Sequence, residues 1–219
     1  MPKLVFQQYH FLVEGECEER YLRRLQELIN ERQDIGQKVS FVIKRGMTMT
    51  SMVKNLSPWV KTTIVEVMDY EGSSQSDQQT FVHALDDMEK ASHLKPGVKC
   101  VLGYSNLIFE LWILLHKMDC RRTLDNKKQY LDLLNQAYKS KFETLSKFKQ
   151  EKSFKKVLNS IDLEDVKTAI QRAEAIRKQN EQDSIPIIYQ KKYKYFKKNP
   201  DCSLQEFIRK ILEDCGLMG

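Results

Sequence analysis

The chain has 219 residues, of which 41% are hydrophobic and 30% are charged, and its formal net charge is +6. This length suits one well-buried domain with a helical addition and excludes two full-sized enzymatic domains. The longest apolar stretch contains Glu110 and is far shorter than the roughly 20 residues that span a bilayer, so we expect no membrane segment. The N-terminal residues lack the pattern of a secretory signal, and the five cysteines form no CxxC pair. A reduced, cytoplasmic protein is therefore expected.

Residues 4–13, 38–43, 62–68 and 98–104 read as four strands in chain order. Segments with a helical spacing of apolar residues lie between these strands. The pattern is weak in residues 49–59. It is clearer in the helix expected to begin after Ser76 or Asp77, either of which is the predicted N-cap, and to end before residue 93. The nearly all-apolar residues 107–117 predict a buried helix. Four repeats of strand and helix predict an α/β fold with a mostly parallel four-stranded sheet flanked by helices.

The second half of the chain has no comparable strand pattern and is expected to be mainly helical. Helices are predicted in residues 130–137, 166–181 and 203–214, the last with Ser203 as its N-cap. Residues 185–196 fit either a strand or an extended basic arm. We divide the chain into a metal-binding core, residues 1–119, and a basic extension, residues 120–219, which is either separate or packed on the core.

Charge supports this division. Residues 1–119 hold 14 basic and 16 acidic residues, a net charge of −2, whereas residues 120–219 hold 22 and 14, a net charge of +8. Such an asymmetry suits a protein that binds a metal ion with one part and a polyanion with the other. Lysine-rich helices are also common for solubility alone, so charge leaves nucleic-acid binding open.

Acidic residues gather where the first and third strands end. Glu14 follows the first strand, Gly15 is expected to allow a sharp reversal of the chain, and Glu18 falls in the first turn of the next helix. Asp69 and Glu71 follow the third strand, where residues two apart point to the same side. Two adjacent carboxylates repel one another unless a cation intervenes, and Mg²⁺ prefers oxygen ligands. The alternative is that these acids are simply solvated or favoured by the helix dipole.

A third polar group follows the fourth strand. Ser105 and Asn106 precede the buried helix, and Asn106 fits both a helix cap and a contact in an active site. Glu110 is a carboxylate in an otherwise apolar helix. Burying it without a partner would cost several kcal/mol, so it needs a metal ion, an Arg or Lys, or a backbone donor.

The candidate nucleic-acid contacts are the lysines and aromatics of one basic stretch, namely Lys191, Lys192, Tyr193, Lys194, Tyr195, Lys197 and Lys198. Lysines neutralise phosphates, and aromatic faces stack on unpaired bases. An edge strand with its aromatics packed inward and its lysines outward is the alternative. A second lysine run, residues 147–156, is interpreted as a solvated helix face.

Together these stretches resemble the RloB-like proteins, members of the wider Toprim superfamily of nucleases, topoisomerases and primases. The resemblance lies in FLVEGxxEExYL from residue 11, a strand ending in Asp69-x-Glu71, SNxxFELWxLLH from residue 105 and NPxxSL from residue 199. It implies a Toprim-like core that binds Mg²⁺ or Mn²⁺ and cleaves phosphodiester bonds of RNA or DNA in bacterial anti-phage defence. An ABC-type ATPase partner is implied as well, and a homodimer stays open.

The resemblance assigns roles to particular residues. Glu14 matches the first-motif glutamate, Asp69 and Glu71 match the acidic second motif, and Glu18, Glu110, Ser105 and Asn106 match further signature positions. We therefore expect Glu14, Asp69 and Glu71 to be catalytic and metal-binding, with Asp69 and Glu71 anchoring one ion and Glu14 acting as a ligand or general acid/base. Glu18 and Glu110 are expected to help bind a second ion, with Ser105 and Asn106 in support. The chain departs from the pattern in two places, because the second motif is D-x-E where D-x-D is usual and Leu107 stands where a proline is usual. A non-catalytic effector or nucleic-acid-binding subunit of a defence complex is therefore the alternative function. Primase or topoisomerase chemistry is a weaker one, since the chain lacks the extra domains of those enzymes.

Overall fold

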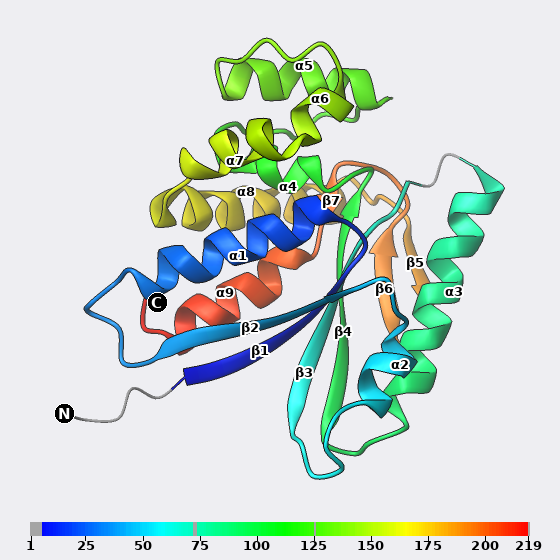
Figure 1. Cartoon of the computed structure of the whole chain (residues 1–219). Coiled ribbons are helices and arrows are strands. Elements are labelled where there is room, and N and C mark those ends of the chain that lie inside the picture. Colours follow the sequence, from blue (N-terminus) through cyan, green and yellow to red (C-terminus); the bar gives the residue numbers. More distant parts are fainter. Residues whose placement is uncertain (1–5, 72–73, 125, 219) are drawn as a thin grey trace.

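A computed structural model describes residues 6–71, 74–124 and 126–218 (Figure 1). Its centre is a five-stranded sheet with the strand order β2-β1-β3-β4-β7. In chain order these strands are β1 (Phe6–Val13), β2 (Lys38–Arg45), β3 (Thr62–Asp69), β4 (Val98–Asn106) and β7 (Asp201–Cys202). The first four are parallel, and β7 adds antiparallel to the end of β4. The predicted mostly parallel sheet is confirmed. The fifth strand was not expected, because two residues show no alternation.

One face of the sheet carries the larger hydrophobic core. Phe11 and Val13 of β1 and Val65 and Val67 of β3 point to this face because side chains alternate along a strand. The helices that cover it are α1 (Glu16–Asn30), α4 (Glu110–Leu115), α8 (Leu163–Gln182) and α9 (Leu204–Asp214). The last two come from the second half of the chain, so a single cluster of buried side chains draws on both halves.

The opposite face carries a second core built by the alternate residues of the same strands. Leu12, Ile64 and Met68 pack there against three further elements. These are α2 (Met49–Lys54), α3 (Gln75–Ser92) and a hairpin of β5 (Ile187–Gln190) and β6 (Tyr193–Phe196). The hairpin settles the choice left open for residues 185–196 in favour of strands.

Three short helices follow α4 and extend the first face, at the top of Figure 1. They are α5 (Lys127–Ala137), α6 (Leu145–Lys149) and α7 (Glu151–Asn159). Phe148 and Phe154 anchor α6 and α7 in the large core, where their rings lie 5.6 Å apart, and Phe148 also stands 5.5 Å from the ring of Phe142. The lysine run of residues 147–156 therefore lies on two helices that are fixed to the core through aromatic side chains.

Several predicted helix ends differ from the structure. The buried helix begins at Glu110, not at residue 107, and Asn106 is the last residue of β4, so its predicted role as a helix cap is wrong. The N-cap of α3 is Ser74, whose hydroxyl accepts a hydrogen bond from the Asp77 backbone amide at 3.1 Å. Ser203 does occupy the N-cap position of α9 but makes no capping bond with its side chain.

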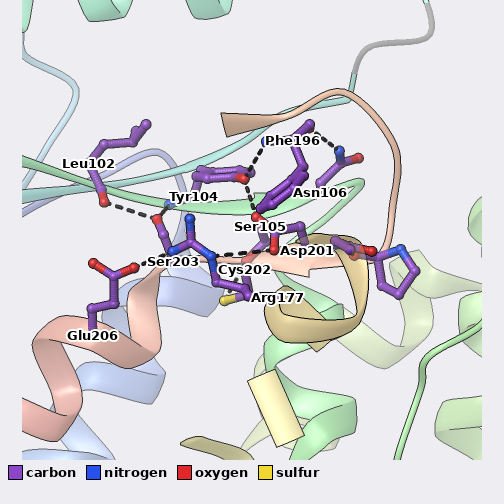
Figure 2. A network of polar contacts seen from close by, with 12 residues as sticks. Leu102, Tyr104, Ser105, Asn106, Arg177, Phe196, Asp201, Cys202, Ser203 and Glu206 are labelled. Atoms are coloured by element: carbon purple, nitrogen blue, oxygen red, sulfur yellow. Dashed lines mark hydrogen bonds and ion pairs between the residues drawn. The ribbon is translucent and has the colours of Figure 1, made fainter. Parts of the chain in front are cut away.

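A buried polar network fastens β7 to the rest of the molecule (Figure 2). Asp201 is fully buried, accepts a hydrogen bond from the Tyr104 hydroxyl and lies 3.6 Å from Nε of Arg177. Arg177 also pairs with the exposed Glu206. The Ser203 hydroxyl accepts from the backbone amide of Tyr104 and donates to a carbonyl of β4, both at 3.0 Å. This network, which we call the β7 clasp, joins β4, β7, α8 and α9.

Within the described residues, all five cysteines are free and buried. Over the same ranges, no helix combines the length and the apolar character that crossing a membrane requires.

Candidate functional site

The acids that follow β1 and β3 come together at one edge of the sheet. These strands are parallel neighbours, and Val13 pairs with Val67, so both chains leave the sheet at the same level. Glu14 turns toward β3, and its Oε2 accepts a hydrogen bond from the Asp69 backbone amide at 3.0 Å. That contact is the direct link between the first and second predicted motifs.

Gly15 matters for a reason other than the one the sequence suggested. Its backbone is extended, with φ of −133° and ψ of −175°, a conformation that any residue adopts. A Cβ atom at this position would lie 2.9 Å from Oε2 of Glu18, because the Glu18 carboxylate folds back over the start of α1. A side chain at position 15 would therefore require the Glu18 carboxylate to move from its present place.

The Asp69 side chain lies at the same edge of the sheet as Glu14. It continues the alternation of Val65 and Val67 and so faces α1 and α4, and its Oδ1 is buried without a hydrogen-bond partner among the described residues. Burial raises the pKa of Asp69 well above its usual range, and the nearby Glu18, Glu110 and Glu14 raise it further. Asp69 as a whole is half-buried, but its Oδ1 atom is buried and several other acids lie near its carboxyl group.

Glu18 and Glu110 complete the cluster from the helix side. Burial raises the pKa of Glu18 to about 7 despite a hydrogen bond from its own backbone amide, and Glu110 adds to the increase. Glu110 has 0% exposure, and neither of its oxygens has a hydrogen-bond partner in the described part of the chain. We call Glu14, Glu18, Asp69 and Glu110 the acid cluster.

The residue that pairs with the charge of Glu110 was not among the residues predicted from the sequence. Lys149, at the end of α6, places Nζ 3.0 Å from Oε1 of Glu110. Burial works against the positive charge of Lys149, but Glu110 outweighs it, so the pKa of Lys149 rises above its ordinary value. Among the partners proposed for Glu110, the lysine is confirmed. The position of Lys149 was hidden in a run of lysines that reads as a solvated helix face.

Glu71 stands apart from the acid cluster. Tyr70 turns to the opposite face of the sheet and packs against Phe81 and Tyr195, while Glu71 pairs with Lys127 at the start of α5, at 2.8 Å. Glu71 is still close enough to raise the pKa of Glu14, after the larger effect of burial. Glu71 therefore lies beside the acid cluster, but its charge is paired with Lys127.

Ser105 and Asn106 support the site from behind. Ser105 pairs with Asp69 in the sheet, and its carbonyl accepts the Tyr70 amide at 2.9 Å, which fixes the end of β3. The Asn106 side chain is buried and donates to the carbonyl of Phe196 at 3.0 Å, so it ties the β5–β6 hairpin to β4. In the described part of the chain, the side chains of Ser105 and Asn106 bond to Cys202 and Phe196 and not to the acid cluster, so both are positioning residues for the strands.

In the described ranges, no three or more His, Cys, Asp or Glu side chains stand close enough together to hold a metal ion as placed. The cluster nevertheless contains buried carboxylate oxygens without hydrogen-bond partners, and such oxygens are costly to keep in a protein interior. Small side-chain rotations are therefore needed before the four acids can share one ion.

The predicted nucleic-acid contacts divide into two groups. Tyr193 and Tyr195 are buried in the second core, which matches the edge-strand alternative and leaves their faces unable to stack on bases as they stand. The lysines, namely Lys191, Lys192, Lys194, Lys197 and Lys198, are exposed. Lys192 pairs with Glu89 near the end of α3, at 3.2 Å. The turn of the hairpin thus lies toward the opposite end of the sheet from the acid cluster.

The raised pKa of Glu18 predicts a pH-dependent stability. Its folded pKa of about 7 exceeds the ordinary 4.5, so between these values the native state holds more protons than the unfolded state. The contribution of Glu18 to the free energy of unfolding therefore falls as pH rises from about 4.5 to about 7. We expect Glu18→Gln to gain stability over the wild type across this range, on the order of 1–3 kcal/mol.

Urea unfolding at a series of pH values measures this difference. Glu19→Gln is the matched control, because Glu19 lies next in α1 and pairs with Arg23 outside the cluster. The control removes a surface ion pair and is expected to differ from the wild type by less than about 1 kcal/mol at each pH. A flat difference for Glu18→Gln would contradict the buried position of Glu18.

A family model described as RloB-like protein matches residues 10–211, nearly the whole chain. No curated protein and no solved structure matches the chain at a significant level. The family match spans all four members of the acid cluster as well as Lys149 and the β7 clasp. The chain belongs to the RloB-like protein family.

Proposed function

We propose that this chain is a Mg²⁺-dependent phosphodiesterase of the Toprim type that hydrolyses RNA or DNA. The observation that carries the proposal is the acid cluster itself. Carboxyl groups from β1, α1, β3 and α4 converge at the carboxyl ends of parallel strands, where ligands bind in open α/β sheets. A buried oxygen of Asp69 is left without a hydrogen-bond partner among the described residues, and the buried Glu110 has the Lys149 ammonium 3.0 Å from its Oε1.

The donor set fits a hard divalent cation such as Mg²⁺ or Mn²⁺. It consists of carboxylate oxygens, which these ions prefer, and it includes no thiolate or imidazole. Glu14 and Asp69 would hold the ion, with Glu18 and Glu110 as further acids of the same cluster. Glu71 would join them only on leaving Lys127. When bound, the ion supplies charge neutralisation at the phosphate and a more acidic water.

Residues of the chain itself would transfer protons, orient the ligands and bind the substrate. Glu14 would act as a ligand or as a general acid or base. Burial raises the pKa of Glu18 to about 7 in the ion-free protein, and a bound cation would favour its ionised form. The Asp69 backbone amide orients Glu14 through their hydrogen bond. The exposed lysines of the hairpin, of which Lys197 and Lys198 follow β6, offer positive charge to a phosphate backbone.

The wider setting of the proposal comes from the family. The resemblance to RloB-like proteins supports a role in bacterial anti-phage defence beside an ABC-type ATPase, in the cytoplasm. A homodimer is compatible with this setting.

A non-catalytic role is the second candidate, as an effector or nucleic-acid-binding subunit of a defence complex. Two observations favour it. The acids do not stand in coordinating positions as placed, and the glutamate of the D-x-E motif is paired with Lys127. This candidate expects nucleic-acid binding or partner binding without cleavage.

Cleavage assays separate the two candidates. Purified protein is incubated with tRNA, single-stranded DNA and duplex DNA in Mg²⁺, in Mn²⁺ and in EDTA. We expect cleavage of at least one substrate that requires the metal, and a loss of about 100-fold or more in Glu14→Ala. Glu19→Ala is the control and is expected to keep the wild-type rate. Equal cleavage by Glu14→Ala would remove the acid cluster from the mechanism, and no cleavage under any condition would favour the binding role.

A further inference from the structure

Lys149 is the cation that reaches the acid cluster in the described part of the chain. Its side chain is 41% exposed, whereas the side chain of Glu110 is completely buried. The two are joined by an ion contact of 3.0 Å, while both oxygens of Glu110 lack a hydrogen bond of good geometry in these residues. Lys149 therefore stands against Glu110 as a positive charge, which is also what a metal ion would do.

The position of Lys149 is fixed by its helix. Phe148, the preceding residue, is fully buried between Phe142 and Phe154, and the chain leaves the helical conformation directly afterwards at Gln150, where ψ is 139°. The lysine is thus delivered by a short helix that is anchored in the core. A solvated surface lysine would have no such constraint.

The charges of the site bear on how many ions it can take. With all four acids ionised, the cluster carries four negative charges and Lys149 supplies one positive charge. One divalent ion would leave a net charge of −1 and two would leave +1, so the total charge alone does not decide the number. A second divalent ion beside Glu110 would, however, have to share this carboxylate with the Lys149 ammonium, which lies 3.0 Å from Oε1. Like charges confined to a buried site repel strongly because the effective dielectric constant is low.

We propose that Lys149 takes the place of a second divalent cation beside Glu110, so that the acid cluster binds one metal ion and not two. The inference rests on the proposed function and specifies how many ions that site uses and which residue completes it. The ion would belong to Glu14 and Asp69, which are joined by a hydrogen bond across the strand ends. Lys149 would stay with Glu110 and act as a positioning residue.

Counting bound ions tests the proposal without an activity assay. The full chain is titrated with Mn²⁺, and the stoichiometry is measured by calorimetry and by the electron paramagnetic resonance signal of free Mn²⁺. We expect one ion in the wild type, two in Lys149→Met and one in Lys149→Arg, which keeps the charge. Adding Glu110→Gln to Lys149→Met is expected to return the count to one, because the second ion then loses its ligand.

Lys147→Met is the matched control. Lys147 lies two residues earlier in α6 and pairs with the exposed Glu143, away from the cluster. It should leave the count at one. Two ions in the wild type, or one ion in folded Lys149→Met with unchanged affinity, would overturn the inference while leaving the proposed function standing. A wild type that binds no Mn²⁺ would overturn the proposed function itself.

Discussion

Asp69→Asn is expected to unfold at a higher temperature than the wild type and, at the same time, to lose metal-dependent cleavage. The amide keeps the volume of the carboxyl group and removes a buried acid whose pKa is raised first by burial and then by three neighbouring acids. An acid whose pKa is raised on folding lowers the free energy of unfolding at neutral pH, by about 1.4 kcal/mol for each unit of the increase, and a neutral amide removes this cost. For a chain of this length, each kcal/mol corresponds to about 2–4 °C in Tm.

The loss of cleavage has the same origin. The negative charge of Asp69 is costly in the folded protein without a cation, and it is the charge that a divalent ion would bind. Function and stability therefore pull this residue in opposite directions, a conflict that is typical of active sites. Differential scanning calorimetry at pH 7.5 in EDTA measures the first effect, and the nuclease assay in Mg²⁺ measures the second.

The control for Asp69→Asn is Glu19→Gln, which removes one negative charge from α1 outside the cluster. It is expected to change neither Tm by more than about 2 °C nor the cleavage rate. A lower Tm in Asp69→Asn would assign Asp69 a structural role. A higher Tm with full cleavage would place the chemistry elsewhere in the molecule.

Asp201→Ala is expected to destabilise the protein by about 3 kcal/mol. The substitution leaves Arg177 without its buried partner and the Tyr104 hydroxyl without its acceptor, and uncompensated buried groups of this kind are strongly destabilising (Figure 2). Glu206→Ala removes the other partner of Arg177, which is exposed, and should cost less than about 1 kcal/mol. Urea unfolding measures both changes.

The double variant Asp201→Ala with Arg177→Met separates charge from packing. If the cost arises mainly from the stranded guanidinium, the double variant should be more stable than Asp201→Ala alone. A loss below about 1 kcal/mol in Asp201→Ala would mean that the β7 clasp contributes little and that the apolar contacts of α9 hold this edge of the sheet.

The sequence predicts the sheet and the strand-end acids because both follow from local patterns. Alternating apolar residues define the four parallel strands, and residues that follow neighbouring parallel strands must meet at one edge. Glu14 and Asp69 accordingly meet at this edge, where the Asp69 backbone amide donates to the Glu14 carboxylate. The strand β7 escapes this reasoning because two residues carry no periodicity and its partner lies 97 residues away.

Lys149 could not be found in this way either. Nothing distinguishes it from the other lysines of residues 147–156, since what matters is the direction in which a five-residue helix delivers it. That direction depends on the buried rings of Phe148 and Phe154, which is a tertiary effect. The sharp reversal expected at Gly15 is also absent, because its backbone is extended. The side chain that lies close to this glycine belongs to Glu18, one helical turn further along the chain.

The contact between Lys149 and Glu110 has a consequence for fragments of this protein. A polypeptide cut after residue 119 would keep every acid of the cluster but would lose the ammonium that faces them and the strand that closes the edge of β4. Such a fragment would expose unbalanced negative charge and an open sheet edge, so it is expected to aggregate rather than to serve as a minimal enzyme. Shortened versions should therefore be designed by trimming loops, with both ends of the chain left in place.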